Sequence, residues 1–325
     1  MPPADVLLVS LGGTTGLREA DAELAASLRR AGASVVVAEA VRVREWRTYA
    51  AIELAWALSA QRAAARAIAE HAPRAVVYSS TTAALLAPRR GAIRFDAPAA
   101  GNRPGRHGIW QRPVERARMR RAPLLLPWSS GGLAEAPSPH GPALVVPFPV
   151  EPSGPATGGA ERDVAAITYG ANPSKKGLDR VLAAWRAVRR EGEELLVAGL
   201  AGEDEPGAVR HLGALPRDEY RALLRRARVF VTAPRREDYG IAQLEALADG
   251  CCLVTTPSPG PYAALPVAAA LDPRLVGDDL GPAIRAALDD PAPGYAERAA
   301  EALAPWRREA VDAVVREELL PRLTP

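Results

Sequence analysis

Residues 229–256 read VFVTAPRREDYGIAQLEALADGCCLVTT and decide the fold of this chain. The stretch begins with an apolar, β-branched run, Val229–Thr232, that predicts a buried strand. After a polar turn, good helix formers over Ile241–Asp249 predict a helix that Gly250 can close. A second apolar run, Leu253–Thr255, restarts the sheet. This order of strand, loop, helix and strand predicts a parallel α/β unit, which binds ligands where the loop leaves the carboxyl end of the strand.

Two glutamates mark the loop and the helix. Glu237 precedes Gly240 in the loop, and Glu245 lies about one turn into the helix, so both are expected to face the crevice mouth. A carboxylate accepts two hydroxyl hydrogen bonds at once, which suits a ribose or a hexose. Gly240 lets the backbone approach a diphosphate, and the helix start favours phosphate. Taken alone, each glutamate also fits the alternative interpretation of an ordinary exposed surface residue.

The order of these residues resembles the signature of family 4 retaining glycosyltransferases of the GT-B fold. The chain has Glu237-Asp238-Tyr239-Gly240, four further residues, Glu245-Ala246-Leu247-Ala248, one residue, and Gly250 before an apolar strand. In that family two glutamates with seven residues between them hold the donor. The resemblance therefore places Glu237 by the transferred sugar and Glu245 by the nucleotide ribose, and it assigns Asp238, Tyr239 and Gly240 to the donor site.

Composition is that of an ordinary soluble globular protein. The chain has 325 residues, enough for two domains, and is 48% hydrophobic and 24% charged. No apolar run approaches a membrane span, and an early first strand leaves no room for a signal peptide. Cysteine occurs only as the adjacent Cys251 and Cys252, which gives no disulfide framework and no metal-ligand spacing. We expect a cytoplasmic protein without a metal site.

The use of lysine is unusual. Of the 41 basic residues only two are lysines, Lys175 and Lys176, and they are adjacent. Elsewhere the chain uses arginine, as a GC-rich coding sequence would produce. A lysine pair in this background indicates that a compact ammonium charge is wanted, for example to reach a phosphate. Chance retention is the alternative.

The lysines lie in a turn that resembles a second motif of the family. Residues 169–177 read YGANPSKKG after a predicted strand. In the family's phosphate-binding turn an arginine and, five residues on, a lysine before a glycine grip the donor diphosphate. Lys176 and Gly177 fit, but Ala171 holds the arginine position. Either Lys175 or an arginine from elsewhere compensates, or diphosphate binding is weaker.

A glycine-rich turn, residues 11–16, follows the first predicted strand. With Glu39 at the end of the next strand, it partly matches a dinucleotide fingerprint, but Leu11 occupies the first glycine position. In GT-B enzymes a Gly-Gly loop at this place touches the donor phosphate or the acceptor, and the resemblance gives that role to Gly12 and Gly13. A tight turn without a ligand is the other interpretation.

Apolar runs and a linker divide the chain. Strands of a first parallel sheet are predicted at Val6–Ser10, Val35–Val37, Ala75–Tyr78, Ala92–Phe95, Leu124–Pro127 and Leu144–Val146. Residues 151–161, EPSGPATGGAE, lack periodicity and predict an interdomain linker. We expect residues 1–150 to form an N-terminal Rossmann-like acceptor-side domain. Residues 151–305 would form a C-terminal Rossmann-like nucleotide-sugar donor domain, and the resemblance implies that a helix at about 306–325 packs back on the first domain.

A basic segment lies within the first half. Residues 103–121 carry seven arginines and one acid, Glu115. The segment is either a solvated surface or a contact for an anionic acceptor or the anionic face of a membrane. No nucleic-acid-binding motif accompanies it, so we expect no nucleic-acid partner.

The sequence thus predicts an α/β chain of the GT-B fold, with two Rossmann-like parallel-sheet domains facing across a cleft. The resemblance implies an enzyme that moves a hexosyl unit from a nucleotide diphosphate sugar to an acceptor hydroxyl, with retention of configuration and without a metal. The acceptor is either a small molecule or lipid-linked. Lys176 and the dipole of the helix starting near Ile241 would stabilise the leaving diphosphate, and no cofactor beyond the donor substrate is expected.

Two alternatives remain open. A nicotinamide-dependent oxidoreductase would use Gly12, Gly13 and Glu39, but it leaves the pattern from Glu237 to Gly250 unexplained. A non-catalytic sugar-nucleotide-binding protein or partner subunit is favoured by two departures from the family pattern. One is Ala171, and the other is Asp96, which stands where many relatives carry a histidine near the donor sugar.

Overall fold

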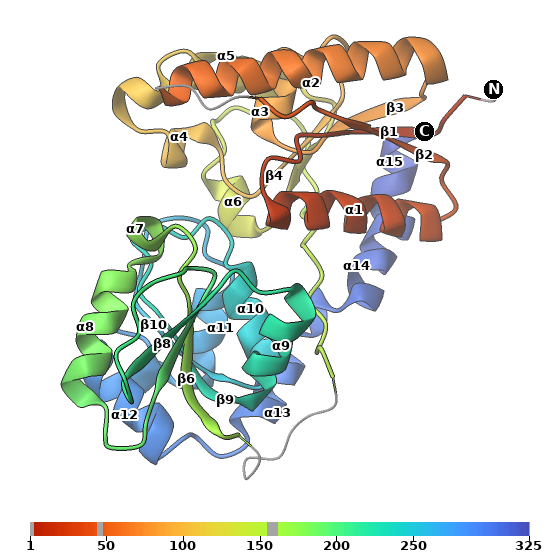
Figure 1. Cartoon of the computed structure of the whole chain (residues 1–325). Helices are drawn as coiled ribbons and strands as arrows, with labels where there is room; N and C mark the ends of the chain where they lie inside the picture. Colours follow the sequence, from red (N-terminus) through yellow and green to blue (C-terminus); the bar gives the residue numbers. More distant parts are fainter. Residues whose placement is uncertain (1–2, 44–47, 155–161, 325) are drawn as a thin grey trace. The chain divides into compact units, whose positions relative to one another are not determined.

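The computed structural model describes residues 3–43, 48–154 and 162–324 (Figure 1). The chain divides into two compact units, Met1–Pro149 with Arg308–Pro325, and Val150–Arg307. Of the predicted linker, residues 155–161 lie outside the described residues. Each unit is built on one five-stranded parallel sheet.

The first unit has the strand order β2-β1-β3-β4-β5. Its strands are β1 (Val6–Ser10), β2 (Val35–Glu39), β3 (Ala75–Tyr78), β4 (Ala92–Phe95) and β5 (Leu125–Pro127). Its helices are α1 (Thr15–Arg30), α2 (Tyr49–His71), α3 (Thr81–Ala84), α4 (Ala99–Asn102), η1 (Gly105–Gly108), α5 (Gln111–Arg121) and α6 (Ser130–Ala134), followed at the chain end by α14 (Arg308–Val314), η5 (Val315–Leu319) and α15 (Leu320–Leu323). Most residues of the central strands are apolar and buried because helices cover both faces of the sheet, and Arg94 of β4 is a buried charged exception.

Alternate residues along the strands of this sheet pack into two hydrophobic cores, one on each face. Leu7 and Val9 of β1 point into a core that includes the buried alanines of α2. Val6 and Leu8 point to the opposite face, where α1 and the C-terminal helices supply Leu24, Leu28 and Val311 among others. The period of two along a strand therefore places helices on both sides of this sheet.

The prediction of a sixth strand at Leu144–Val146 is wrong. Leu144 N and Val146 N each donate to a β5 carbonyl at 2.9 Å, but the only bridge here is an isolated one between Ala143 and Leu125, and residues 144–146 form no strand. Leu125 N also donates to Pro142 O at 2.8 Å, but the next donor position on β5 is Pro127, which has no N–H to extend the ladder. The apolar run is thus an extended edge segment whose ladder with β5 is interrupted at Pro127.

The second unit has the strand order β10-β9-β6-β7-β8. Its strands are β6 (Val164–Tyr169), β7 (Leu195–Ala198), β8 (Val209–Gly213), β9 (Ala227–Thr232) and β10 (Cys252–Thr255). Its helices are α7 (Pro173–Lys176), α8 (Leu178–Val188), α9 (Arg217–Arg226), α10 (Ile241–Ala248), α11 (Ala264–Leu271), η3 (Pro273–Leu275), α12 (Leu280–Asp289), α13 (Tyr295–Ala302) and η4 (Ala304–Trp306). The chain adds β7 and β8 on one side of β6, then β9 and β10 on the other. The sheet therefore reverses its order between β6 and β9, the position at which open α/β sheets bind ligands.

Candidate functional site

The loops after β6 and β9 meet at this reversal point. The two strands are parallel neighbours, with Ile167 opposite Phe230, so their carboxyl ends lie at the same sheet edge. The backbone N–H of Arg235, in the second loop, donates to the carbonyl oxygen of Lys175, in the first, at 2.9 Å. The two motifs singled out in the sequence, which are about 60 residues apart, are therefore side by side.

Local sequence shapes the first loop. Asn172 has φ 57° and its side chain accepts from Lys175 N at 3.3 Å, so it caps α7, and Pro173 starts that helix. Gly177 ends it with φ 63°, and a Cβ there would lie 1.9 Å from the carbonyl oxygen of Ala233. Only glycine lets the two loops come this close. The single turn of α7 thereby presents both lysines to the second loop.

Each lysine pairs with a carboxylate of the second loop. Lys176 Nζ lies 2.6 Å from Glu237 Oε2, and Lys175 Nζ lies 2.5 Å from Asp238 Oδ2. Glu237 is 4% exposed and also accepts a hydrogen bond from Gln243 Nε2 at 2.9 Å. The predicted site residues of the two loops thus form one cluster of charges at the sheet edge.

An arginine that the sequence analysis did not identify joins this cluster. Arg236 Nε donates to Asp238 Oδ1 at 2.8 Å, so the Asp238 carboxylate lies between a guanidinium and the Lys175 ammonium. Burial raises the pKa of Asp238, but Lys175 and then Arg236 outweigh it and hold the pKa below its usual value. Asp238 therefore stays ionised and holds two cations in place.

The turn after β10 holds the second loop in place. Glu237 N donates to Pro259 O at 3.1 Å, and Gly260, with φ 106°, packs so closely on Glu237 that a Cβ would lie 2.3 Å from its carbonyl oxygen. Gly240 has φ 92° and precedes α10, and no side chain caps this helix. The first N–H groups of α10 consequently face the loop region without a capping side chain, which is the arrangement that favours an anion.

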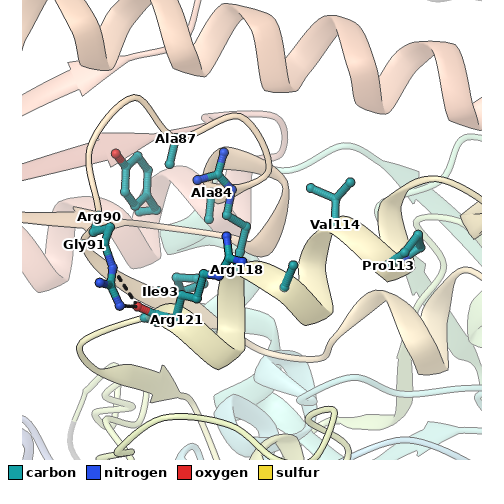
Figure 2. A pocket seen from close by; sticks show the side chains of 12 residues that line it. Ala84, Ala87, Arg90, Gly91, Ile93, Pro113, Val114, Arg118 and Arg121 are labelled. Carbon is teal, nitrogen blue, oxygen red and sulfur yellow. Dashed lines mark hydrogen bonds between the residues drawn. The ribbon is translucent and has the colours of Figure 1, made fainter.

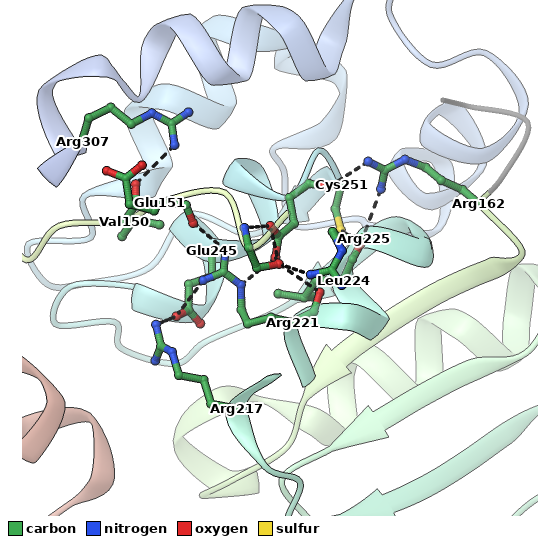
Figure 3. A network of polar contacts seen from close by, with 12 residues as sticks. Val150, Glu151, Arg162, Arg217, Arg221, Leu224, Arg225, Glu245, Cys251 and Arg307 are labelled. Atoms are coloured by element: carbon green, nitrogen blue, oxygen red, sulfur yellow. Dashed lines mark hydrogen bonds and ion pairs between the residues drawn. The ribbon is translucent and has the colours of Figure 1, made fainter. Parts of the chain in front are cut away.

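Glu245 lies in a different group of charges (Figure 3). It is buried on α10 and pairs with Arg217 and Arg221 of α9. Arg221 in turn donates to Asp249 Oδ2 at 2.6 Å and to the carbonyl oxygen of Glu151 at 2.7 Å. The structure brings Glu237, Lys175 and Lys176 together, but it gives Glu245 its own arginine partners. Arg217 and Arg221 are one helical turn apart, a spacing that could have identified them in the sequence.

Tyr239 takes a packing position. Its side chain is buried, and its hydroxyl accepts a hydrogen bond from Trp306 Nε1 at 3.0 Å. Its carbonyl oxygen accepts from Ala263 N at 3.0 Å. These contacts hold the loop between β9 and α10.

Gly12 and Gly13 lie in the first unit, after β1. This is the reversal point of the first sheet, since β2 is on one side of β1 and β3 on the other. Gly12 has φ 60°, and its carbonyl oxygen accepts from Arg18 Nη1 at 2.9 Å. Thr14 caps α1 by accepting from Leu17 N at 3.2 Å. The turn is therefore at a ligand-binding edge, although its backbone geometry is also explained by the turn itself.

The basic segment is more ordered than a solvated surface. Arg103 pairs with Glu53 at 2.7 Å, and Arg112 donates to the carbonyl oxygens of Gly105 and Gly108. Glu115 is buried and accepts from Ala99 N at 2.9 and 3.0 Å, and burial raises its pKa to about 7. Other arginines of the segment, Arg106, Arg116 and Arg120, are exposed.

Two large apolar side chains are exposed near the first part of this segment. Tyr49 is 58% exposed and Ile109 is 66% exposed. Tyr49 makes an edge contact with the ring of His107, with 5.5 Å between ring centroids. In the described part of the chain, no helix combines the length and the apolar character needed to cross a membrane.

Comparison with known proteins agrees with the fold and with the second unit's motifs. Residues 164–290 match the family model described as Glycosyl transferases group 1. No curated protein matches the chain by sequence. Among solved structures, WaaG, a glycosyltransferase involved in lipopolysaccharide biosynthesis, is 14% identical over 96% of this chain and 99% of its own, with a TM-score of 0.70.

Two further structures are similar along nearly their whole length. Sucrose-phosphate synthase from Thermosynechococcus elongatus is 15% identical over 96% of both chains, with a TM-score of 0.75. An E. coli structure described as trehalose-6-phosphate bound with UDP-2-fluoro glucose is 10% identical over 98% of this chain and 99% of its own, with a TM-score of 0.68. The predicted two-domain α/β fold of the GT-B type is confirmed, as is the resemblance to group 1 glycosyltransferases over residues 164–290.

Proposed function

We propose that this protein is a glycosyltransferase that moves a hexosyl unit from a nucleotide diphosphate sugar to an acceptor hydroxyl. The observation that carries the proposal is the pairing of Lys175 and Lys176 with Asp238 and Glu237 at the reversal point of the second sheet. These residues lie within the stretch that matches the glycosyltransferase family. One of the similar structures is described with UDP-2-fluoro glucose, which supports a nucleotide sugar as the donor class.

The cluster suits a diphosphate. Lys175, Lys176 and Arg236 give three positive charges against the two negative charges of Glu237 and Asp238, which leaves a net charge of +1. The uncapped start of α10 adds N–H donors and a favourable dipole. A bound diphosphate would compete with the carboxylates for the ammonium groups. Arg236 or Lys175 would then supply the charge that Ala171 does not.

The same groups suit the departure of the diphosphate. As the bond from the sugar C1 to the phosphate oxygen breaks, negative charge grows on that oxygen, and Lys176 with the α10 dipole would stabilise it without a metal. Glu237, held by Gln243, would accept hydrogen bonds from sugar hydroxyls. For retention, the acceptor oxygen would bond to C1 on the face that the phosphate leaves, and the acceptor proton would pass to the departing phosphate oxygen.

The remaining predicted site residues take binding roles in this proposal. Glu245 would accept the ribose hydroxyls while Arg217 and Arg221 orient its carboxylate. Gly240 and the backbone of Tyr239 would border the phosphates. Gly12 and Gly13, at the reversal point of the first sheet, would touch donor phosphate or acceptor.

A thermal-shift panel of UDP, GDP and ADP tests the proposal. A ligand at 100 times its dissociation constant stabilises a protein by about 2.7 kcal/mol, so the correct nucleoside diphosphate is expected to raise the melting temperature clearly. Slow hydrolysis of the matching nucleotide sugar would separate an enzyme from a non-catalytic binding protein. Stabilisation by NADH, with none by any nucleoside diphosphate, would instead favour the oxidoreductase.

We also propose that the basic segment contacts an anionic membrane surface, because Tyr49 and Ile109 stand exposed beside it. Changing Arg106, Arg116 and Arg120 together to glutamine is expected to weaken cosedimentation with anionic vesicles at least tenfold, since each basic residue near such a surface adds about 1 kcal/mol. Arg112 is left intact because it holds the η1 carbonyls. Donor hydrolysis should be unchanged. Failure of the unaltered protein to bind these vesicles at low salt would contradict the membrane contact.

A further inference from the structure

The first unit contains a pocket that the proposed transfer reaction does not use (Figure 2). It has a volume of about 750 Å³, within the range of small-molecule sites. Gly91 and Ala122, two of its lining residues, lie just before the first residues of β4 and β5. The pocket therefore opens near the amino-terminal ends of these strands, whereas Gly12 and Gly13 follow the carboxyl end of β1.

The pocket wall is predominantly apolar. One wall is a single face of α5 that includes Val114 and Ala117. The other is formed by Ala84, at the end of α3, and by residues between α3 and β4 such as Ala87. Small alanine side chains on both walls leave the space open. Tyr78 also lines the pocket, but its hydroxyl already donates to the carbonyl oxygen of Arg89 at 2.7 Å. The interior is thus suited to an aliphatic group.

Positive charge gathers on one side of this pocket. Figure 2 shows Arg90 donating to the carbonyl oxygen of Arg121, through Nε at 3.0 Å and through Nη2. Arg118 lies nearer to them than Pro113 and Val114 do. Arg118 is fixed there because its Nε donates to the carbonyl oxygen of Leu85 at 3.0 Å, which uses one of five donors of the guanidinium.

No acid balances the three arginines. The pocket lining contains no aspartate or glutamate, and within the described part of the chain these arginines form no ion pair. Arginines in the last turn of α5 also complement the helix dipole. That effect accounts equally for Arg120, which does not line the pocket, and it does not account for Arg90, which comes from the loop before β4.

We propose that this pocket binds a single anionic amphiphile, an aliphatic chain with a phosphate or carboxylate head, taken up as a monomer. The chain would lie against Val114, Ala117 and Ile93, and the arginines would pair with the head. The site is independent of the nucleotide-sugar cluster, which lies in the other unit.

Calorimetric titration with monomeric dodecyl phosphate tests the proposal on the full chain. We expect one molecule to bind, with no measurable binding of inorganic phosphate or of neutral dodecyl maltoside. Ala117→Trp, at an exposed helical position that lines the pocket, should fill the space and weaken binding at least tenfold. Arg118→Gln with Arg121→Gln should also weaken it at least tenfold.

A matched double variant on the same helix is the control. Arg116→Gln with Arg120→Gln removes the same charge from α5 outside the pocket and should leave the affinity unchanged. An equal loss in both double variants would overturn the proposal in favour of a diffuse positive field. Equal binding of the neutral detergent, an unaltered affinity in the tryptophan variant, or binding to anionic vesicles without binding of monomeric dodecyl phosphate would also overturn it. Melting curves would show that each variant is folded.

Discussion

Alanine in place of Lys176 is expected to lower kcat for sugar transfer about 10²–10³-fold, the cost of removing one preorganised group that stabilises developing negative charge. The Lys176 side chain is 20% exposed, and its ammonium lies 2.6 Å from Glu237, where the loops after β6 and β9 meet. Because the lost interaction is a charge-assisted contact to phosphate, nucleoside diphosphate binding should weaken while nucleoside binding stays the same. Steady-state kinetics with calorimetry of UDP and uridine, or the matching pair, would measure both.

Two variants distinguish this role from a structural one. Lys176→Arg keeps the positive charge and should recover much of the lost diphosphate affinity. Arg180→Ala removes a cation one turn further along the chain, on α8. The Arg180 guanidinium pairs only with the exposed Asp278 carboxylate, at 3.9 Å, among the described residues. It should leave both kcat and nucleotide binding unchanged. If Lys176→Ala reduced nucleoside and diphosphate binding equally, the assignment of Lys176 to phosphate would be wrong.

Strands β9 and β10 of the second sheet could be predicted because each contains a short apolar run between turn signals. Val229–Thr232 lies within β9 (Ala227–Thr232), and Leu253–Thr255 lies within β10 (Cys252–Thr255). The strand prediction at Leu144–Val146 failed because it also rested on apolar character alone. Apolar character predicts burial, and this segment is at least half-buried, but a ladder with β5 also needs an N–H that Pro127 of the partner strand does not provide.

Sequence spacing could identify Lys176 and Glu237 but not their contact. The pairing depends on β6 and β9 being neighbours, which is a property of sheet order and not of either loop alone. Gly177 gave a local signal, since a glycine after the lysines permits the close approach to Ala233. The need for glycine at this position follows only from the structure, because the contact is with Ala233 of the second loop.

The arginine partners were missed because the chain uses arginine almost everywhere. Against 39 arginines, Arg217, Arg221 and Arg236 carry no compositional signal, whereas the lysine pair does. Their roles depend on burial and on the carboxylates that face them. Burial of Arg221 and Glu245 together is what makes α9 and α10 one electrostatic unit.

The buried ion pair between Arg221 and Asp249 gives the second large expected effect. Asp249→Ala is expected to destabilise the unit of residues 150–307 by about 3–5 kcal/mol, because it leaves the Arg221 guanidinium buried without its main carboxylate. Arg221 is 6% exposed, and its Nε lies 2.6 Å from Asp249 Oδ2. Asp249 also accepts from Ser153 N at 2.8 Å, so the start of the linker would loosen as well. A fall in melting temperature of roughly 6–20 °C should follow.

An exposed pair of the same chemistry provides the control. Arg226 pairs with Asp163, but both side chains are more than half exposed. Asp163→Ala should therefore leave the melting temperature almost unchanged, since solvent screens such pairs. A large effect in both variants would mean that lost charge in general, and not burial, determines the result.

A double variant separates the buried-charge penalty from the loss of packing and hydrogen bonds. If the penalty dominates, Asp249→Leu combined with Arg221→Met should be more stable than Asp249→Ala alone, because no unpaired charge then remains inside. Loss of the Arg221 side chain would also remove its contacts with Glu245 and with the Glu151 carbonyl oxygen. The stable double variant should therefore bind the nucleoside more weakly if Arg221 orients Glu245 toward the ribose. Restored stability with unchanged nucleoside affinity would show that Arg221 holds the fold together and has no part in donor binding.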